Sequence, residues 1–522
     1  MSLDPRTNTV DGVLRRSAAK YPDRVAVVFE DRTRTYRELD DAVTRVAAYL
    51  LGLGLEHGDR VAAYGTNSDA YAIGFLACAR AGLVHVPVNY ALKGEELRYL
   101  VAQSGARAVL VDPALAPTLD SVRSDLDLDH VIALRDAELS VVTIGEAGEV
   151  PVFEPRATST DLAQLLYTSG TTSKPKGAMM SHGALVHEYV SSVIALGLDK
   201  NDNPLICMPM YHSAGMHVFM LPYLSVGATV SLMQAPDIPE ILRRVEAEKI
   251  GSLFLAPTVW VPLANHPDLE TRDLSSLKKA QYGASIMPVT VLNRLRERYP
   301  DIGFYNCFGQ SEIGPLATVL QPSEHADRPS SCGRAVFFVE TRVVDADGND
   351  VADGESGEVL YRSPQLCNGY WENPEATAEA FRDGWFHSGD LVVRDEEGFI
   401  TVVDRIKDVI NTGGILVASR EVEDAVYTHP AVAEVAVIGT PDEKWIEAVT
   451  AIVVLKDGND ELTPEALIAH VKERIAPFKV PKHVRFVAEL PRNQSGKLLK
   501  RNCAPSEACY RFCLTFGSFS GL

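Results

Sequence analysis

A short apolar run that ends in a polar loop constrains this chain more than any other segment. Residues 162–166 are mostly apolar, as in a buried strand, and residues 167–177 read Tyr-Thr-Ser-Gly-Thr-Thr-Ser-Lys-Pro-Lys-Gly. Such a loop at a strand end gathers backbone N–H groups, hydroxyls and ammonium groups in one small volume, which favours a polyphosphate anion. Composition alone favours a solvated linker. Two lysines around Pro175, between a strand and a helix-like run, favour the phosphate loop.

This loop is not a Walker A motif, because Pro175 follows Gly170 where the pattern requires its second glycine. It resembles the phosphate loop of the adenylate-forming superfamily, which holds acyl-CoA synthetases, peptide-synthetase adenylation domains and beetle luciferases. The usual motif has Gly where this chain has Ser173, and its lysines and other glycines are in place. The resemblance implies ATP as a ligand of Thr168, Ser169, Gly170, Thr171, Thr172 and Lys176.

Length and composition exclude several other classes of protein. The 522 residues are too many for one core and predict about two to four lobes. A hydrophobic content of 46% is typical of a globular chain. The formal net charge of −20 disfavours nucleic acid as a partner, because phosphate-backbone binding requires a basic face. ATP requires only a local positive site and stays compatible with this charge.

The chain shows no sequence signal for export or membrane insertion. Residues 1–10 are polar and lack the apolar region of a signal peptide, and the apolar stretch 72–88 is interrupted by Arg80. The cysteines at positions 78, 207, 307, 332 and 367 are scattered singly, which predicts neither a zinc site nor a disulfide framework. We therefore expect a cytoplasmic protein without a membrane span.

Strand-like and helix-like segments alternate in the N-terminal region. Residues 35–38, Thr-Tyr-Arg-Glu, form a capping box that predicts the start of a helix. Buried strands are predicted by the apolar runs 25–29, 61–63, 84–88 and 108–111. This alternation predicts an α/β fold.

The pattern changes in the C-terminal part of the chain. From about Val336 it becomes typical of β-hairpins, with turns predicted at 343–350 and 394–398. Beyond Asp404 a smaller unit is predicted, with a helix over 420–427, strands over 432–438 and 449–455, and a helix capped by Thr463.

Three regions follow from this change in pattern. Residues 1–404 are predicted to form a large adenylation domain of α/β subdomains plus a β-rich subdomain. Residues 405–501 are predicted to form a small, mobile α+β domain that carries a catalytic lysine. Residues 502–522 contain three cysteines, three phenylalanines and no regular pattern, and we interpret them as a non-native or disordered tail.

Further motifs extend the resemblance from about residue 10 to residue 500, in the order of the superfamily. Tyr-Asn-Cys-Phe-Gly-Gln-Ser-Glu at 305–312 implies that Ser311 contacts the α-phosphate and that Glu312 binds Mg²⁺ and takes part in catalysis. Gln-Tyr-Gly-Ala-Ser at 281–285 resembles the adenine-side loop and implies Gly283 and Ala284 as nucleotide contacts. Taken alone, both segments are typical of ordinary turns.

Two C-terminal motifs complete the series. Ser-Gly-Asp at 388–390 and Asp-Arg-Ile-Lys-Asp at 404–408 imply that Asp390 binds the ribose, that Arg405 binds the ribose or phosphates, and that Lys407 is the hinge. Arg-Asn-Gln-Ser-Gly-Lys at 492–497 resembles the terminal catalytic segment and implies Lys497 as a catalytic residue. In isolation these segments are a charged connector and a solvated lysine.

A histidine segment points to the acid substrate. Met-Pro-Met-Tyr-His-Ser at 208–213 resembles the segment whose histidine lies beside the acyl carboxylate and implies a catalytic role for His212, although a lone histidine is more often structural. Trp260 would cap a tunnel against long chains, although a bulky aromatic side chain is more often a core residue. The expected acyl pocket consists of His212, Ala214, Gly215, Val218, Trp260 and Ile313.

The resemblance is strongest to fatty-acyl-CoA synthetase-like ligases and implies an ATP-dependent carboxylate ligase. A carboxylic acid would attack the α-phosphate of ATP, Mg²⁺ would offset the charge, and the acyl-adenylate would pass to coenzyme A. Two departures favour an alternative acceptor. Ile415-Leu416 stands where CoA-using relatives usually have Glu-Asn, and Ile446 stands where they usually have Gly. Neutral drift, with coenzyme A still accepted, is one interpretation of these departures. Alternatively, bulkier apolar groups there would narrow a thiol tunnel and favour an amide bond synthetase that uses an amine.

Other functions fit the sequence less well. A serine hydrolase would require a closing glycine after 309–313, which reads Gly-Gln-Ser-Glu-Ile. A peptide-synthetase unit would normally adjoin a carrier domain, and a luciferase-like oxygenase would share only the first half-reaction. A non-enzymatic scaffold does not account for so many polar Gly-rich segments. The sequence gives neither the acid nor the oligomeric state.

Overall fold

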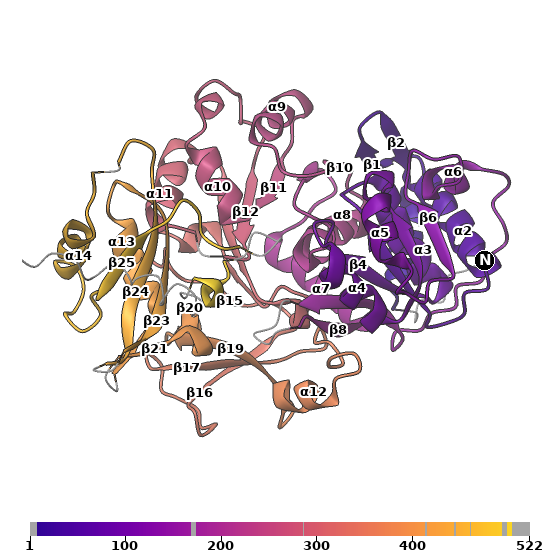
Figure 1. Ribbon diagram of the computed structural model, residues 1–522. Coiled ribbons are helices and arrows are strands. Elements are labelled where there is room, and N and C mark those ends of the chain that lie inside the picture. Colours follow the sequence, from indigo (N-terminus) through magenta and orange to yellow (C-terminus); the bar gives the residue numbers. More distant parts are fainter. Residues whose placement is uncertain are drawn as a thin grey trace, which may run out of the picture. The chain divides into compact units, whose positions relative to one another are not determined.

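The computed structural model describes residues 8–168, 174–285, 287–412, 415–442, 445–459, 461–492 and 498–503 (Figure 1). The chain divides into two compact units. Unit 1 comprises 1–342, 360–388 and 397–400, and unit 2 comprises 343–359, 389–396 and 401–522. Each unit is described by itself. The predicted boundary at residue 404 and the predicted tail stay predictions.

A six-stranded sheet of unit 1 carries the start of the predicted phosphate loop. Its strand order is β6-β5-β3-β4-β7-β8; the first five strands are parallel and β8 is antiparallel to β7. The strands are β3 (Arg60–Tyr64), β4 (Val84–Val88), β5 (Ala106–Val111), β6 (His130–Ala133), β7 (Leu162–Thr168) and β8 (Lys176–Ser181). The helices between them are α3 (Asp69–Ala81), α4 (Gly94–Ser104), α5 (Ala116–Arg123) and α6 (Val141–Glu146). The predicted strands at 61–63, 84–88, 108–111 and 162–166 are confirmed.

A nine-stranded sheet forms the other layer of unit 1, in the order β15-β14-β13-β12-β11-β9-β10-β1-β2. Its strands are β1 (Val25–Phe29), β2 (Arg32–Thr35), β9 (Pro204–Ile206), β10 (Val230–Leu232), β11 (Ser252–Leu255), β12 (Lys279–Gly283), β13 (Gly303–Phe308), β14 (Thr318–Leu320) and β15 (Arg334–Ala335). The central strands are parallel, and β2, β14 and β15 are antiparallel to their neighbours. Strand β1 is confirmed, and its parallel partner β10 comes from about 200 residues later in the chain.

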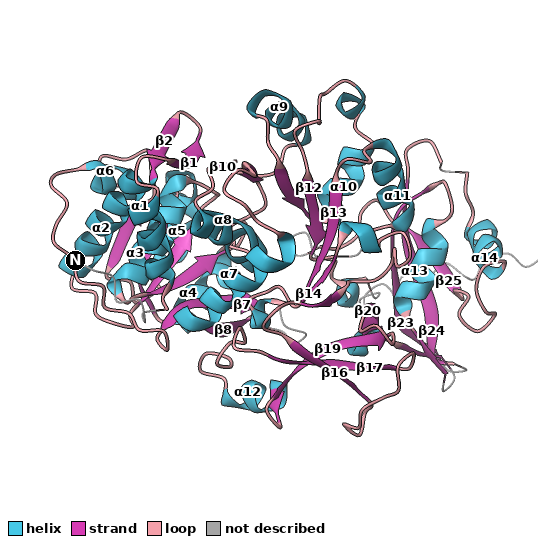
Figure 2. Ribbon diagram, turned by 180° about the vertical axis from the view of Figure 1, so that it is seen from behind, coloured by secondary structure: helices cyan, strands magenta, loops and turns pink. Residues whose placement is uncertain are grey.

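Helices cover these sheets (Figure 2), and the apolar residues of the sheets are buried. They are α1 (Val10–Lys20), α2 (Tyr36–Gly52), α7 (His182–Leu196), α8 (Leu221–Val226), α9 (Ile238–Glu248), α10 (Pro257–Ala264) and α11 (Val289–Arg298). The predicted capping box at the start of α2 is confirmed, because the Thr35 hydroxyl accepts from the Glu38 N–H and the Glu38 carboxylate accepts from the Thr35 N–H. Helix α2 packs against α3 and α6.

Residues 340–405 form β-hairpins, as the sequence predicts from about Val336 onward. The strands are β16 (Glu340–Val344), β17 (Ser356–Arg362), β18 (Phe381–Arg382), β19 (Trp385–Arg394) and β20 (Ile400–Arg405), with helix α12 (Pro374–Ala380) before β18. In the turn at 343–350, the Asp345 carboxylate accepts from the N–H groups of Asp347 and Asn349, both at 2.9 Å. These bonds give the acidic cluster a turn-forming role.

The C-terminal part of unit 2 is an α+β layer. Its strand order is β22-β21-β24-β23, with β25 beside β24. The elements are β21 (Ile410–Thr412), β22 (Ile415–Val417), α13 (Ser419–Tyr427), β23 (Val432–Asp442), β24 (Ile446–Leu455), α14 (Pro464–Lys472) and β25 (His483–Phe486). The predicted helix at 420–427, both strands and the Thr463 cap are confirmed. Among the described residues, no helix is long and apolar enough to cross a membrane.

Candidate active site

Glu312 and the start of the predicted phosphate loop meet in unit 1. Glu312 lies in the 3₁₀ helix Ser311–Ile313, directly after β13, and is buried. Its Oε1 atom accepts a hydrogen bond of 3.3 Å from the hydroxyl of Thr168, the last residue of β7. These two residues are 144 positions apart and come from different sheets. The structure therefore places the predicted metal-binding carboxylate beside the entrance to the predicted phosphate loop.

Tyr370 joins this pair and was not identified from the sequence. Its hydroxyl donates to Glu312 Oε1 at 3.0 Å, and its ring centroid lies 5.2 Å from the Lys176 ammonium. The second contact is a cation–π interaction. Burial, and then the neighbouring Glu312, raise the pKa of the Tyr370 phenol, so this side chain stays a neutral donor. Lys176 is the first residue of β8. It follows the loop that begins after Thr168.

The described part of this cluster fits a magnesium ion bound mainly through a substrate. Among the described residues, no group of three or more His, Cys, Asp or Glu side chains gathers in one place. Mg²⁺ in phosphate-transfer sites is usually held by one or two carboxylates plus substrate phosphates, so one buried carboxylate beside a lysine suits it. Glu312 would hold the ion.

His212 and Ser311 are linked through Ser213. The Ser213 hydroxyl lies 3.0 Å from the Ser311 hydroxyl, so the histidine segment and the Glu312 segment are in contact. The His212 side chain is exposed, with its ring 5.1 Å from that of Tyr211. This exposure is compatible with a substrate contact, and the role of His212 stays a prediction.

Three of the predicted acyl-pocket residues lie on one helix, and the others come from other segments. Ala214, Gly215 and Val218 lie on the π-helix Ala214–Met220, a conformation that is frequent at functional sites. A Cβ atom at Gly215 would lie 2.7 Å from the Pro209 carbonyl oxygen, so the close backbone approach requires glycine there. Ile313 is fully buried.

Trp260 lies in the core beside the nine-stranded sheet. Its side chain is buried, its indole N–H donates to the Gln281 carbonyl at 3.0 Å, and its ring packs near Phe304. These contacts satisfy both the apolar ring and its single donor. They account for Trp260 as a core residue.

The predicted adenine-side loop follows β12. A Cβ at Gly283 would lie 2.1 Å from the Cys307 carbonyl oxygen, so strand packing by itself requires this glycine. Ala284 has φ +66°, which is unfavourable for a residue with a Cβ atom. Strained backbone of this kind is concentrated at functional sites.

The predicted ribose and hinge residues lie in unit 2. Asp390 is buried and forms an ion pair of 2.6 Å with Arg405. Asp404 accepts from both the N–H and the hydroxyl of Ser419 at 2.6 Å, which fixes the end of β20. Lys407 is exposed on the 3₁₀ turn Ile406–Asp408, between β20 and β21. A short exposed turn suits a hinge, and this role stays a prediction.

Lys500 anchors the described segment 498–503 within unit 2. Its ammonium lies 2.8 Å from the Glu423 carboxylate and donates to the Ser419 hydroxyl. Both side chains of the ion pair are largely buried. Ser419 in turn binds Asp404, so Lys500 is tied to a residue three positions before the predicted hinge Lys407. Lys497 lies outside the described residues, as do Ser169, Gly170, Thr171 and Thr172.

Ile415 and Ile446 are both exposed in the sheet of unit 2. Both pair with the buried Thr412 of the strand between them. Their exposed fractions are 48% and 60%. Ile446 also has φ +67°, a conformation that is a genuine outlier for a β-branched residue.

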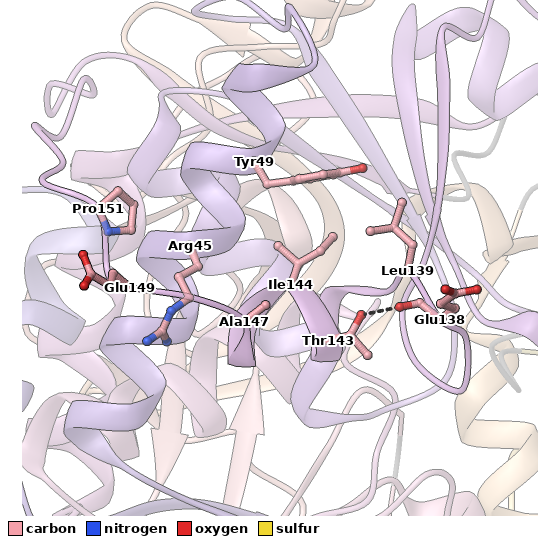
Figure 3. A pocket seen from close by; sticks show the side chains of 9 residues that line it. All are labelled: Arg45, Tyr49, Glu138, Leu139, Thr143, Ile144, Ala147, Glu149 and Pro151. Atoms are coloured by element: carbon pink, nitrogen blue, oxygen red, sulfur yellow. Dashed lines mark hydrogen bonds between the residues drawn. The ribbon is translucent and has the colours of Figure 1, made fainter.

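A separate cavity of about 450 Å³ lies in unit 1 (Figure 3). It opens between α2, α6 and the chain on either side of α6, and the Thr143 hydroxyl donates to the Glu138 carbonyl at its edge. Its lining residues are Arg45, Tyr49, Glu138, Leu139, Thr143, Ile144, Ala147, Glu149 and Pro151. None of these was predicted as a site residue.

Comparison with known proteins matches nearly the whole chain. The family model for AMP-binding enzymes matches residues 14–371, and the model for their C-terminal domain matches residues 421–497. The chain is 38% identical to a feruloyl-CoA synthase of Amycolatopsis over 93% of this chain and 96% of that protein. It is 33% identical to a long-chain-fatty-acid–CoA ligase of Salmonella typhimurium, over 94% and 93% of the two chains. The solved structure of an amide bond synthetase from Marinactinospora thermotolerans has a TM-score of 0.87 and 29% identity, over 95% of this chain and 99% of that one.

Proposed function

This chain belongs to the AMP-binding enzyme family, and we propose that it acts as an acyl-CoA synthetase. As a member it is an adenylate-forming acid ligase that uses ATP. The predicted superfamily and the α/β fold with a small C-terminal domain are confirmed. The proposal adds the acceptor of the acyl group, the Mg²⁺ requirement and the roles of individual residues.

We assign the adenylation step to the residues that the motifs identify. The substrate carboxylate, oriented by His212, attacks the α-phosphorus of ATP, and pyrophosphate leaves in line. Lys176 and the hydroxyl-rich loop bind the phosphates, Ser311 contacts the α-phosphate, and Lys497 stabilises the charge of the transition state. Glu312 would hold Mg²⁺, which would supply positive charge to offset the negative charge of the triphosphate. Gly283 and Ala284 border the adenine, Asp390 and Arg405 bind the ribose, and the small domain turns about Lys407 before transfer.

The contact between Thr168 and Glu312 carries this assignment. It joins the predicted phosphate loop to the predicted metal ligand across 144 residues, and Tyr370 adds a link to Lys176. Three groups suited to a metal–triphosphate complex are thereby gathered in one place, although they come from two different sheets. Coenzyme A as acceptor is supported by the relatives, which include a feruloyl-CoA synthase and a fatty-acid–CoA ligase.

An amide bond synthetase is the second candidate function. The exposed Ile415 and Ile446, the latter in a strained backbone conformation, stand where CoA-using relatives usually have Glu and Gly. Strain of about 1 to 3 kcal/mol persists only where the surroundings or the function require it. Apolar side chains at these positions would disfavour a polar cofactor and would tolerate a small amine. The similarity to an amide bond synthetase is consistent with this candidate.

Product analysis by mass spectrometry tests both candidates. The protein is incubated with ATP, Mg²⁺ and a panel of aromatic and aliphatic acids, once with coenzyme A and once with primary amines. Acyl-CoA formed over many turnovers, with AMP released in equal amount, is the expected result. If the protein forms amide and little thioester, the acyl-CoA synthetase proposal is wrong and the amide bond synthetase takes its place. Absence of AMP with every acid would overturn the ligase assignment.

A further inference from the structure

Glu188 is a fully buried carboxylic acid that the adenylation scheme does not use. It lies on α7, the helix that follows the phosphate-loop hairpin, and its exposed fraction is 0%. Within the described ranges, no Lys, Arg or His side chain forms an ion pair with it. Burial raises the pKa of this carboxyl well above its usual range. An unpaired carboxyl in a core costs stability, whereas an apolar side chain of similar size would not.

Three donors hold Glu188, and one of them belongs to the segment after Glu312. The Ser192 hydroxyl donates to Oε1 at 3.0 Å, and the Leu316 backbone N–H donates to the same atom at 3.4 Å. The Gln365 side-chain NH₂ donates to Oε2. Helix α7, the 311–316 segment and the 363–370 segment therefore meet at one carboxyl group.

Gln365 extends this contact to the backbone of the same segment. Its NH₂ also donates to the Ile313 and Leu316 carbonyls, both at 3.2 Å. The Ser191 hydroxyl donates to its amide oxygen at 2.6 Å, which fixes the amide orientation. Gln365 is itself fully buried, so these bonds are shielded from water and strengthened.

The turn after Ile313 packs directly on Glu188. A Cβ atom at Gly314 would lie 3.1 Å from both Cβ and Oε2 of Glu188, and this glycine has φ +106°. A further hydrogen bond joins the 363–370 segment to the 311–316 segment, because the Cys367 N–H donates to the Glu312 carbonyl at 2.8 Å. The backbone from the Glu312 carbonyl to Leu316 is thus fixed by Glu188, Gln365 and Cys367.

We propose that Glu188 is a positioning residue that, together with Gln365, holds residues 311–316 in the orientation that presents Ser311 and Glu312 to the nucleotide. Buried polar networks that are fully satisfied select one backbone arrangement over its alternatives. A displacement of about 1 Å at a reacting group lowers rates by about 100-fold, so the fixed backbone has a direct catalytic consequence. The catalytic part of this inference rests on the proposed adenylation activity. The structural part does not.

Two substitutions at one position separate positioning from simple stability. Glu188→Leu removes every acceptor while retaining volume. Glu188→Gln retains an acceptor for Gln365 and supplies a donor for Ser192. We expect Glu188→Leu to lower kcat for acid-dependent pyrophosphate release by about 100-fold, with the Kd for ATP, measured by calorimetry, changed less than threefold. Glu188→Gln should recover most of this loss.

Asp11→Leu is the matched control. Asp11 is also a buried carboxyl on a helix of unit 1, where it pairs with Arg80 away from the 311–316 segment. Its replacement should lower the melting temperature and leave kcat per folded molecule unchanged. Equal losses of kcat in Glu188→Leu and Asp11→Leu would overturn the positioning role. If Glu188→Leu does not fold, Ser191→Ala with Ser192→Ala takes its place, and a kcat within twofold of wild type would overturn the role.

Hydrogen–deuterium exchange gives a readout that needs no catalytic activity. Peptides covering 309–318 should exchange faster in Glu188→Leu than in wild type or Asp11→Leu, and Glu188→Gln should restore protection. Unchanged exchange in these peptides would overturn the inference, whatever reaction the wild type performs. A wild type that releases no AMP, combined with faster exchange in Glu188→Leu, would instead overturn the proposed function and leave the structural role of Glu188 supported.

Discussion

The Tyr370 hydroxyl donates a 3.0 Å hydrogen bond to Glu312, while its ring lies against the Lys176 ammonium. One side chain therefore contacts the proposed metal ligand through its polar end and a proposed phosphate ligand through its apolar face. The hydroxyl and the ring can be tested separately, because phenylalanine keeps the ring and removes only the hydroxyl.

Tyr370→Phe should lower kcat/KM for adenylation by about tenfold and raise the Mg²⁺ concentration needed for half-maximal rate. A group that only orients a metal ligand typically contributes about 10- to 100-fold. Initial rates of pyrophosphate release across a Mg²⁺ titration measure both effects. The control is Tyr71→Phe, because the Tyr71 hydroxyl is buried without a partner among the described residues. A Mg²⁺ dependence that is the same in wild type and Tyr370→Phe contradicts the assignment.

Lys497→Ala should lower adenylate formation by about 100-fold or more and leave the Kd for ATP nearly unchanged. A transition-state contact affects kcat far more than ground-state binding. Pyrophosphate release and calorimetric ATP binding measure the two effects. The exposed Lys472, on α14, provides the control variant Lys472→Ala. Normal pyrophosphate release by Lys497→Ala would remove Lys497 from the mechanism.

The sequence predicts the local elements and the motif order, because these depend on short-range patterns. The capping box at Thr35 and the cap at Thr463 are examples that the structure confirms. Sheet order is different. The pairing of β1 with β10 spans about 200 residues, and no local periodicity specifies such a partner.

In the candidate site, too, the sequence predicts residues that stand in local motifs and misses residues whose role depends on long-range contacts. Thr168 and Glu312 could be identified because each stands in a motif of several residues. Tyr370 and Glu188 could not, since a single aromatic or acidic residue carries no spacing signal and acquires its role only when distant segments meet. The π-helix that carries Gly215 was likewise not predicted. Its extra residue per turn changes the spacing of apolar residues, and this change cannot be detected where nearly all residues are apolar.

Ile446→Gly combined with Ile415→Glu and Leu416→Asn should raise the CoA-dependent rate if these side chains obstruct the thiol. The single change Ile446→Gly should also stabilise the small domain by up to about 1 kcal/mol, because glycine adopts φ +67° without strain. Thioester formation at saturating acid and ATP measures the first effect, and urea unfolding measures the second. An unchanged CoA-dependent rate in the triple variant removes this argument for an amine acceptor.

Acid should destabilise the protein through buried neutral histidines. Burial lowers the pKa of His217 to about 3, and burial together with His217 lowers the pKa of His85 to about 3. Both bind protons in the unfolded chain near pH 6.5 but not in the folded one, so their contribution to stability is present above pH 6.5 and is lost as pH falls towards 3.

His217→Gln should flatten this pH dependence. His217 contacts Gln164 at 2.7 Å and the Tyr189 hydroxyl at 3.0 Å, so glutamine retains polar partners without titrating. Between pH 6.5 and 5.0 the wild type should lose about 1.6 kcal/mol more unfolding free energy than the variant, because the slope rises from about half of 1.4 kcal/mol per pH unit at pH 6.5 to nearly the full value at pH 5.0. Urea unfolding at the two pH values measures this difference, and equal losses in both proteins would assign the acid sensitivity to other groups.

Lys500 and Glu423 should show strong coupling in a double-mutant cycle. Lys500→Met leaves Glu423 buried without its partner and should lower the unfolding free energy of the small domain by about 3 kcal/mol. Adding Glu423→Leu should recover most of that loss, because an apolar pair of similar size needs no compensation. Urea unfolding of wild type, the two single variants and the double variant gives the coupling energy. Additive losses would show that the ion pair does not hold residues 498–503 against α13.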